Sequence, residues 1–459
     1  MGSILAASFS TPLKSAPVAT TAAMDIITTV TKTIANSLLC TREFYIPGAI
    51  CVYPALSKKI IINRAPFHFG VLMKRYTVLD SFRGICALCV ALHHLNVTGS
   101  ITEWAIFRNS TYMVEFFFIL SGFVLTHSYF SRDFNKITLA NFVISRSFRL
   151  FPLHIIMLLV FLLFEFGKLA AQNYGFYFNK PAFTELSAPT EFIPNLLLLQ
   201  SWIPSAESLS FNYPSWSISV EYYLYLVFGG VLFFSNDRKS IAIALFALLS
   251  VWGFYSLLSH NLLLKDDAFR GISCFFFGSL IYFIHSRIAN ININKYVASL
   301  LEMAIILACF FCMTLPIENK GVTVSILYGL AIIIFSGEFG IFSSLLKSTF
   351  FQNLGKHSFS IYMTHAAIIF LMVSGAMILS KLLGVELSYS QTNPYGNPIR
   401  YINLGNATIN NILVFCFLAV ILFVSKLSYD SIEKRSIRYG KKCQINHTVQ
   451  NDTNQQSTQ

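Results

Sequence analysis

Charged residues are scarce in this sequence, since Asp, Glu, Lys and Arg together make up 12% of its 459 residues. A soluble domain carries about 25% charged residues, so the scarcity argues against an ordinary water-soluble protein of two or three domains. Hydrophobic residues make up 55% of the chain, and the mean hydropathy is +0.60. The composition therefore predicts that lipid supplies part of the solvent, with the 45 Phe and 21 Tyr filling gaps between helices and forming interfacial belts.

The sequence also lacks the period-two alternation in short segments that is typical of a membrane β-barrel. An open sheet cannot satisfy its edges in hydrocarbon, which leaves helices as the spanning elements. We therefore predict an all-α polytopic membrane protein, a single bundle of about ten transmembrane helices, each long enough to cross a hydrocarbon core of ~30 Å. The expected helices lie near 78–97, 112–130, 150–171, 215–234, 240–258, 268–286, 296–315, 321–337, 358–382 and 407–428.

Acidic residues are outnumbered, with 21 Asp and Glu against 33 Lys and Arg and a net charge of +12. In a soluble protein such an excess would suggest nucleic acid as a partner. Here most basic residues lie between the apolar runs, so we expect membrane lipids and no nucleic acid. The basic residues concentrate in alternate loops, which predicts that the start of the first helix and the C-terminus both face the cytoplasm.

Cysteine is present in an odd number, nine, and no disulfide framework is indicated. The pairs Cys86/Cys89 and Cys309/Cys312 have the spacing of metal or redox motifs but lie inside apolar runs. A thiolate is costly to form in an apolar site. We interpret the four as packing residues and predict no metal site.

Three segments differ in composition. Residues 1–72 are rich in Ser, Thr and Ala and contain no run of spanning length, while Met73 followed by two basic residues resembles a natural start. An over-extended start is the favoured interpretation, and a disordered tail or an organelle transit peptide are the alternatives. Residues 73–440 form the expected membrane domain. Residues 441–459, rich in Asn, Gln and Thr, are expected to be a disordered cytoplasmic tail.

Ionisable residues inside spanning helices cost at least ~2.5 kcal/mol each and therefore suggest function. In the first helix, Arg83 and His94 are eleven positions apart, which returns them to one face within about 20° and separates them by about 16 Å along the axis. His93 points elsewhere. This geometry suits an anionic donor bound from the cytoplasm at Arg83 and proton transfer at His94. Alternatively, Arg83 extends to the membrane boundary and His94 is hydrogen-bonded within the bundle.

Further polar residues lie within or beside the apolar runs. Arg146 and Arg149 stand at i and i+3 at the expected cytoplasmic start of the third helix, where they either grip phosphates or only anchor the helix. Glu221 lies inside the fourth helix, where an unpaired carboxylate is hard to explain as packing. The remaining positions are Asp80, Ser121 beside Gly122, Trp216, Arg270, Tyr362 and His365.

The longest loop on the outer side, about 172–214, contains five prolines and precedes the segment that carries Glu221. Its apolar stretch 192–203 suggests a short interfacial or re-entrant helix. Because binding residues are often placed on loops held by a rigid scaffold, this loop is a candidate lid over a site.

Taken in chain order, these segments resemble the acyltransferase-3 family over about residues 76–440. The family has about ten membrane helices and transfers acyl groups, commonly acetyl from acetyl-CoA, to sugars of cell-surface polysaccharides. The resemblance implies an integral protein of a bacterial inner membrane, whereas the extension 1–72 has no counterpart in the family. The motifs are Asp80-x-x-Arg83-Gly84, Arg83-x10-His94, Phe117-Phe118-x-x-Ser121-Gly122-Phe123, Arg146-x-x-Arg149-Leu150-x-Pro152, Ser215-Trp216-Ser217-x-x-x-Glu221, Ser358-x-Ser360-Ile361-Tyr362-x-x-His365 and Tyr429-x-x-x-Glu433-Lys434.

The resemblance implies O-acyl transfer from a thioester, which needs a base, stabilisation of the oxyanion and a clamp for the donor. His94 is the expected base, and Glu221 either orients it or acts as a base itself. Arg83, Arg146 and Arg149 are expected to hold the phosphates of acyl-CoA, which serves as donor substrate with no bound cofactor. Asp80, Ser121, Trp216, Arg270, Tyr362 and His365 are expected to support the site.

The acceptor implied is a glycan or lipid-linked glycan, and a covalent acyl-His94 and direct transfer both remain open. A transporter or a polysaccharide polymerase without acyl transfer is the alternative, since either also has many helices and a large outer loop. The two halves of the chain show no internal repeat of the kind found in many transporters, and the ordered motifs favour the acyltransferase.

Overall fold

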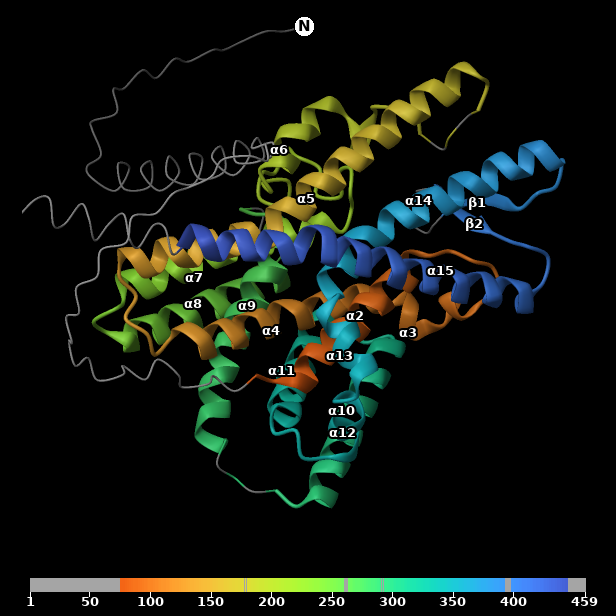
Figure 1. The fold of residues 1–459 in the computed structure, drawn as a ribbon. Helices are drawn as coiled ribbons and strands as arrows, with labels where there is room; N and C mark the ends of the chain where they lie inside the picture. Colours follow the sequence, from red (N-terminus) through yellow and green to blue (C-terminus); the bar gives the residue numbers. More distant parts are fainter. Residues whose placement is uncertain are drawn as a thin grey trace, which may run out of the picture. The chain divides into compact units, whose positions relative to one another are not determined.

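The chain divides into two compact units, Met1–Val71 and Leu72–Gln459. The computed structural model describes residues 75–444 apart from 177, 179, 260–262, 290, 292 and 393–397, all within the second unit. The prediction for residues 1–72 therefore lies outside the described residues. Figure 1 shows the described part as packed helices with one small β-hairpin.

Among the described residues, ten helices of 17 or more residues account for the ten predicted spans, one helix for each apolar run. Eight of them are long and apolar enough to cross a membrane. α11 is apolar but shorter than these eight. α2 is long enough but is less apolar, because ionisable residues lie near both of its ends. The fold class is confirmed. The helices are α2 (Thr77–His94), α4 (Met113–Tyr129), α5 (Lys136–Asn173), α7 (Ser215–Phe234), α8 (Lys239–Leu258), α9 (Asp266–Ile288), α10 (Lys295–Thr314), α11 (Lys320–Ser336), α14 (Ser358–Leu383) and α15 (Ala407–Ser428).

Short elements connect these helices. The hairpin β1–β2 is antiparallel, pairs Ser388 with Ile402, and was not predicted from the sequence. A π-helical turn, η5 (Tyr429–Glu433), follows α15, and the helix continues to Gln444, inside the segment predicted as a tail. The other short elements are α3 (Ala105–Arg108), α6 (Phe192–Leu196), α12 (Ile341–Leu346), α13 (Thr349–Lys356), β1 (Ser388–Thr392), β2 (Pro398–Ile402) and 3₁₀ turns at Ile101–Glu103, Ser110–Tyr112, Glu185–Ser187 and Pro189–Glu191.

Two expectations for this part of the chain were wrong. α5 begins at Lys136, because the Asn135 side chain caps it by accepting from the Thr138 N–H at 2.9 Å, and Pro152 does not interrupt it. Arg146 and Arg149 therefore lie within a long helix and not at its start. In the outer loop, a helix forms only over Phe192–Leu196 and not over 192–203.

Glycines set the closest helix contacts. A Cβ on Gly122 of α4 would lie 1.8 Å from the Phe275 carbonyl oxygen of α9, and a Cβ on Gly278 would lie 1.9 Å from that of Ile119. Gly122 of the Ser-Gly pair therefore allows close packing of α4 against α9. On α2, a Cβ on Gly84 would lie 2.5 Å from the Leu354 backbone of α13.

Candidate active site

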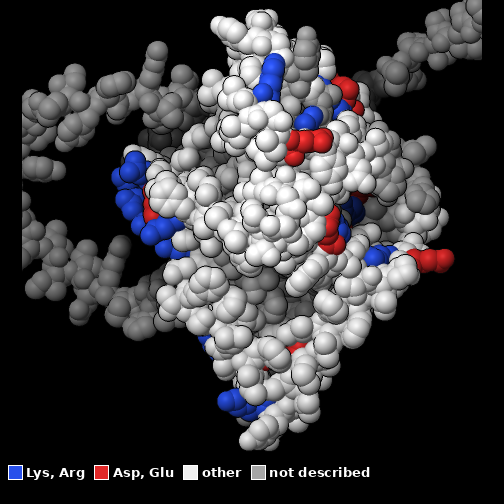
Figure 2. Space-filling view, turned by 90° about the vertical axis from the view of Figure 1, so that its right-hand side faces the viewer, with Lys and Arg blue, Asp and Glu red and all other residues white. Residues whose placement is uncertain are grey.

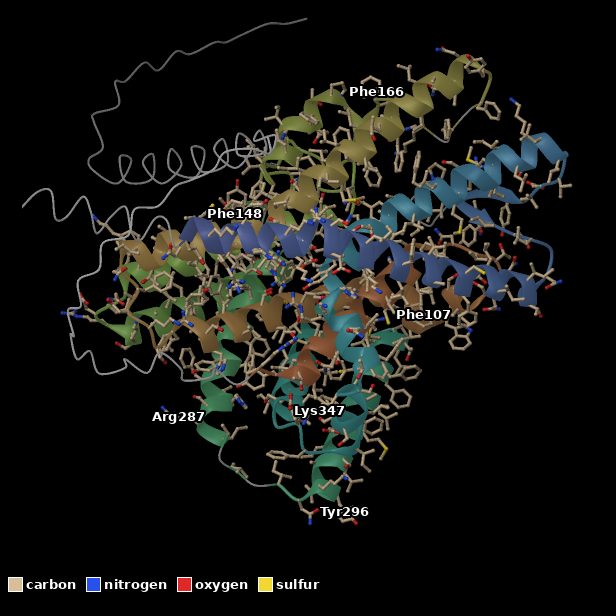
Figure 3. The ribbon with its side chains drawn as sticks, in the orientation of Figure 1. Phe107, Phe148, Phe166, Arg287, Tyr296 and Lys347 are labelled. Carbon is tan, nitrogen blue, oxygen red and sulfur yellow. The ribbon has the colours of Figure 1, made fainter. Side chains whose placement is uncertain are left out.

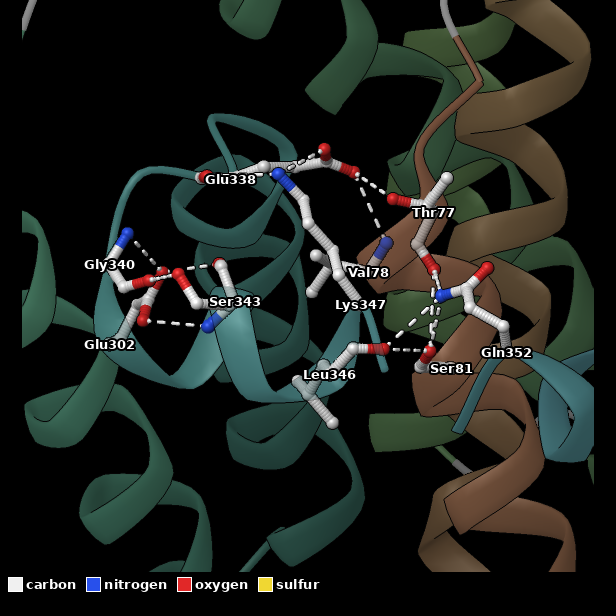
Figure 4. Close-up of polar contacts among 11 residues, drawn as sticks. Thr77, Val78, Ser81, Glu302, Glu338, Gly340, Ser343, Leu346, Lys347 and Gln352 are labelled. Carbon is white, nitrogen blue, oxygen red and sulfur yellow. Dashed lines mark hydrogen bonds and ion pairs between the residues drawn. The ribbon is translucent and has the colours of Figure 1, made fainter. Parts of the chain in front are cut away.

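The N-terminal end of α2 is fixed by side chains from a distant part of the chain (Figure 4). Glu338 accepts hydrogen bonds from the Thr77 hydroxyl at 3.0 Å and the Val78 N–H at 3.2 Å, and Lys347 forms an ion pair with it at 3.0 Å. Glu338 thereby satisfies N–H and hydroxyl donors that the start of a helix leaves open. Burial raises the pKa of Glu338, but these hydrogen bonds and the Lys347 charge outweigh it, so its pKa is lowered.

A second set of contacts continues this anchor one turn further along α2. The Ser81 hydroxyl donates to the Leu346 carbonyl at 2.7 Å, and Gln352 donates to the Thr77 carbonyl and to the Ser81 hydroxyl, each at 2.8 Å. The helix that carries Arg83 and His94 is therefore held in position by α12 and α13.

A basic pocket of about 260 Å³ opens at this end of α2. Arg75 pairs with Asp80 at 2.8 Å, while neither Arg83 nor Arg149 makes a hydrogen bond or ion pair to the described residues. The structure thus brings Arg83 of α2 and Arg149 of α5 to one pocket. It also places Lys356 there, which sequence reasoning missed. The pocket is lined by Arg75, Asp80, Arg83, Arg149, Gly355, Lys356, Ser358, Phe359, Tyr429, Glu433 and Ile437.

Glu433 is a buried carboxylate in this pocket, which also contains Asp80. It lies on the π-helical turn and accepts a hydrogen bond from the Ser360 hydroxyl at 2.8 Å. π-Helical turns are frequent at functional sites. A second pocket of about 230 Å³ adjoins, because it shares Arg75, Asp80 and Arg83.

Arg146 lies apart from these pockets. Its guanidinium carbon is 5.4 Å from the Phe142 ring centre, 5.5 Å from that of Tyr225 and 5.9 Å from that of Tyr129. It lines neither basic pocket. The prediction that Arg146 and Arg149 form one clamp is therefore not matched by the structure, since three aromatic rings hold Arg146 one turn away.

His94 lies at the opposite end of α2, with its Nδ1 2.9 Å from the Val90 carbonyl oxygen. Because a carbonyl only accepts, Nδ1 carries the proton and Nε2 of the neutral ring carries the lone pair. The ring centre lies 4.5 Å from that of Tyr213 and 5.3 Å from that of His365. His93 turns instead to the Phe107 carbonyl, with Nδ1 at 3.3 Å.

His94 lines a cavity of about 500 Å³. The loop 172–214 contributes to its lining, as expected of a lid, together with Arg400 of β2. The lining residues are His94, Asn96, Phe161, Glu165, Lys168, Phe178, Lys180, Thr184, Leu186, Ser187, Leu209, Phe211, Tyr213, Trp216, Ala366, Ile369, Phe370, Val373, Ser374, Met377 and Arg400.

Trp216, at one wall of this cavity, is held from behind by a buried ion pair. The Arg270 guanidinium carbon lies 4.8 Å from the Trp216 ring centre, and Arg270 Nε donates to Glu115 Oε1 at 2.9 Å. Glu115 is 3% exposed. Sequence reasoning missed Glu115, although a carboxylate within the apolar run 112–130 was the same signal that singled out Glu221.

Glu221 lies between the two ends of α2. It accepts hydrogen bonds from the Ser121 hydroxyl at 2.6 Å and from the Tyr225 hydroxyl. The structure joins it to these two groups and not to His94, in contrast to the expectation that it orients the histidine. Glu221 and Arg83 line a small cavity of about 30 Å³ with Tyr362.

Tyr362 lines this small cavity, and His365 lies next to it. The Tyr362 hydroxyl accepts from the Ser217 hydroxyl at 2.9 Å, and its ring centre is 5.9 Å from that of His365. His365 is fully buried, and neither of its ring nitrogens has a hydrogen-bond partner within the described part of the chain. The arrangement is a basic pocket, a small cavity that shares Arg83 with it, and a large cavity lined by His94.

Comparison with known proteins identifies the family of this chain. The acyltransferase MdmB of Streptomyces mycarofaciens is 34% identical over 139 residues, which cover 30% of this chain and 30% of that protein. No solved structure matches the chain. The family model for an acyltransferase domain, that of the acyltransferase-3 family, matches residues 76–432, so this protein belongs to the acyltransferase-3 family.

Proposed function

We propose that this protein transfers an acyl group, acetyl in the first instance, from acyl-CoA to a hydroxyl of a cell-surface sugar. The observation that carries the proposal is the placement of His94, whose Nδ1 is held by Val90 while the ring lines a cavity of about 500 Å³. A neutral imidazole fixed in this way presents Nε2 to an incoming hydroxyl, as a general base requires.

The donor fits the basic pocket. Three phosphate groups of CoA need cations, and guanidinium groups bind phosphate oxygens with paired N–H donors. Arg83 and Arg149 line this pocket and make no hydrogen bond or ion pair within 4 Å to the described residues, although both interact electrostatically with Glu433. Lys356 adds a third cation. These three side chains are the proposed contacts of the CoA phosphates.

The thioester then lies between the pocket and the cavity. Arg83 and His94 are separated by eleven residues of helix, about 16 Å of rise, and the pantetheine arm of CoA connects phosphates to thioester over that interval. The small cavity beside Arg83 has a volume of only about 30 Å³. Passage of the arm therefore requires Tyr362 and its neighbours to move.

The chemistry follows from these positions. The acceptor hydroxyl oxygen attacks the thioester carbonyl, its proton goes to His94 Nε2, the C–S bond breaks, and the proton ends on the CoA thiol. Glu221, which is hydrogen-bonded to Ser121 and Tyr225, lines the small cavity beside Arg83 and positions its neighbours there. No bound cofactor is needed in this scheme.

Adjacent histidines provide the matched test. We expect His94→Ala in lipid nanodiscs to lower CoA release and ester formation by about 10²–10⁴-fold, the usual effect of losing a general base. His93→Ala should retain most activity, because His93 bonds to Phe107 and does not line the cavity. Both variants must still bind CoA. Equal activity of His94→Ala and wild type would contradict the proposed role of His94.

A further inference from the structure

Two spanning helices, α5 and α14, each form one wall of the large cavity. Its α14 residues recur at i, i+3, i+4, i+7, i+8 and i+11, which is one helix face over three turns. α5 supplies residues at i, i+4 and i+7 on the other side. The α14 residues are Ala366, Ile369, Phe370, Val373, Ser374 and Met377, and the α5 residues are Phe161, Glu165 and Lys168.

Both helices lie at the edge of the bundle. On α14, Leu371 is 57% and Leu382 71% exposed, and on α5, Leu163 is 67% and Phe166 54% exposed. In a membrane-spanning chain these large apolar side chains contact lipid. Figure 1 shows α5 and α14 diverging toward their far ends, and Phe166 marks the outer part of α5 in Figure 3. Figure 2 shows a mostly uncharged surface on this side, with separate small acidic and basic patches.

An aromatic pair closes the interval between the two helices. The rings of Phe164 on α5 and Phe370 on α14 stack with centres 4.6 Å apart and planes 12° apart. Phe370 also lines the cavity, so the pair stands between the cavity and the lipid. Two apolar rings that meet without a hydrogen bond can separate to admit a chain.

Apart from Ser374, the α14 wall of the cavity is apolar, and the charged and ring-polar groups lie elsewhere in its lining. His94, Tyr213 and Trp216 lie at its inner end. At the other end Lys168 pairs with Glu165 at 3.0 Å, and Glu165 accepts from the Phe183 N–H of the outer loop at 2.9 Å. A free polymer, hydrated at every sugar, would gain little from the apolar wall, whereas an alkyl or isoprenoid chain would gain by leaving water.

We propose that the acceptor is a membrane-embedded amphiphile, a hydroxyl-bearing headgroup on an apolar chain, that enters laterally between α5 and α14. The headgroup reaches His94 while the chain lies along the α14 face, and the Phe164–Phe370 pair parts to admit it. The reaction is the one given above, in which the C–S bond of the donor breaks and an ester C–O bond forms on the headgroup. This inference rests on the proposed function and specifies its acceptor.

Photo-crosslinking in nanodiscs tests the site. The probe is dodecyl β-glucoside with a diazirine in its chain, and labelled peptides are mapped by mass spectrometry. We expect saturable labelling on the cavity faces of α14 and α5 that unlabelled dodecyl glucoside displaces at least tenfold more effectively than methyl glucoside. A diazirine phosphocholine, which has the chain but no hydroxyl, should label the cavity less. Equal labelling by both lipids, or equal displacement by methyl glucoside, would overturn the inference.

Matched variants separate the cavity face from the lipid face. Val373→Trp fills the cavity, and we expect it to lower the labelling at least tenfold, with Met377→Trp as a second variant of the same kind. Leu371→Trp, on the lipid side of the same helix, should label like wild type. Phe164→Ala should speed labelling. All must still bind CoA, which reports folding. Unchanged labelling in both cavity variants would also overturn the inference.

The two proposals fail in different ways. If soluble glycans are acylated in a His94-dependent reaction while the probe never labels the cavity, the lateral route is wrong and the proposed function stands. If CoA does not bind and no acceptor of either kind is acylated, the proposed function itself is wrong.

Discussion

Single side chains in this protein derive their chemical state from one or two neighbours. The Val90 carbonyl alone decides which nitrogen of His94 bears the proton. Arg146 and Arg149 are three residues apart in sequence, yet one is enclosed by aromatic rings and the other lines the basic pocket. Residue type and spacing therefore identify candidates, and the neighbours decide which candidate can bind a substrate.

This difference predicts unequal effects of the same substitution. Arg149→Lys should weaken CoA binding about tenfold, or about 1.4 kcal/mol, because Lys keeps the charge but not the paired donors. Arg146→Lys should leave CoA affinity nearly unchanged, because Arg146 lines neither basic pocket. Titration of purified protein with CoA gives both affinities. An equal loss of CoA affinity in the two variants would support the prediction that Arg146 and Arg149 hold the phosphates together.

Glu115 offers a second prediction at this scale. Glu115→Gln removes the charge that pairs with Arg270, and Arg270 in turn supports Trp216. Breaking a buried ion pair on one side costs up to about 3–5 kcal/mol, so we expect a lower unfolding temperature together with weaker acceptor turnover. CoA affinity should not change, because neither residue lines the basic pocket. A variant as stable and active as wild type would show that Trp216 needs no such support.

At the scale of helices, the proposed reaction depends on the position of α2, because both ends of the reaction path lie on this helix. Its N-terminal end depends on contacts from Glu338, Leu346 and Gln352, which are more than 250 residues away in sequence. The hydrogen bonds that Glu338 accepts favour its ionised form. The position of Arg83 is thus linked to the charge of a carboxylate outside the spans.

The pH dependence of this anchor has a definite sign. The pKa of Glu338 is lowered in the folded protein, so its contribution to stability is complete above the ordinary Glu pKa of about 4.3 and is lost as the pH falls through the folded value. At pH 7, Glu338→Gln should unfold at a lower temperature than wild type, and the difference should persist down to about pH 4.3 and shrink as the pH falls below it. Thermal unfolding in nanodiscs measures it. A difference that stays constant with pH would contradict the anchor.

The sequence predicted helices well where the signal is local. Apolar length and the 3.6-residue period located ten helices and put Arg83 and His94 on one face of α2. The start of α5 at Lys136 was missed because its first turns are polar and are stabilised by an Asn135 cap. The hairpin β1–β2 was missed because its stability comes partly from contacts such as the bridge between Val97 and Ile402.

The composition of the site depended on tertiary packing and was only partly predictable. Lys356 reaches the basic pocket because Gly84 and Gly355 let α2 and α13 approach at backbone distance. Tyr213 and His365 come to His94 from a loop and from a distant helix. Contacts between residues so far apart leave no periodic pattern in a single sequence, so they could not be predicted from it.

At the scale of the whole molecule, the direction of transfer depends on which side of the membrane holds the basic pocket. Arg75 lines that pocket at the start of the described chain, and Gly440 lies beyond the π-helical turn whose Glu433 lines the same pocket. Both positions therefore belong to one side. CoA is available in the cytoplasm, and the positive-inside rule assigns these basic segments to the same compartment.

We therefore expect reporter fusions at Arg75 and at Gly440 to be active in the cytoplasm, and a fusion in the 172–214 loop to report the outer side. An even number of crossings between Arg75 and Gly440 is required, as ten helices provide and nine would not. If the two ends report opposite sides, α2 or α11 does not cross the bilayer, because α11 is shorter than the other spans and α2 carries ionisable residues near both ends. The donor pocket and the His94 cavity would then no longer lie on opposite sides of one crossing, and transfer across the membrane would have to be abandoned in favour of acylation on a single side.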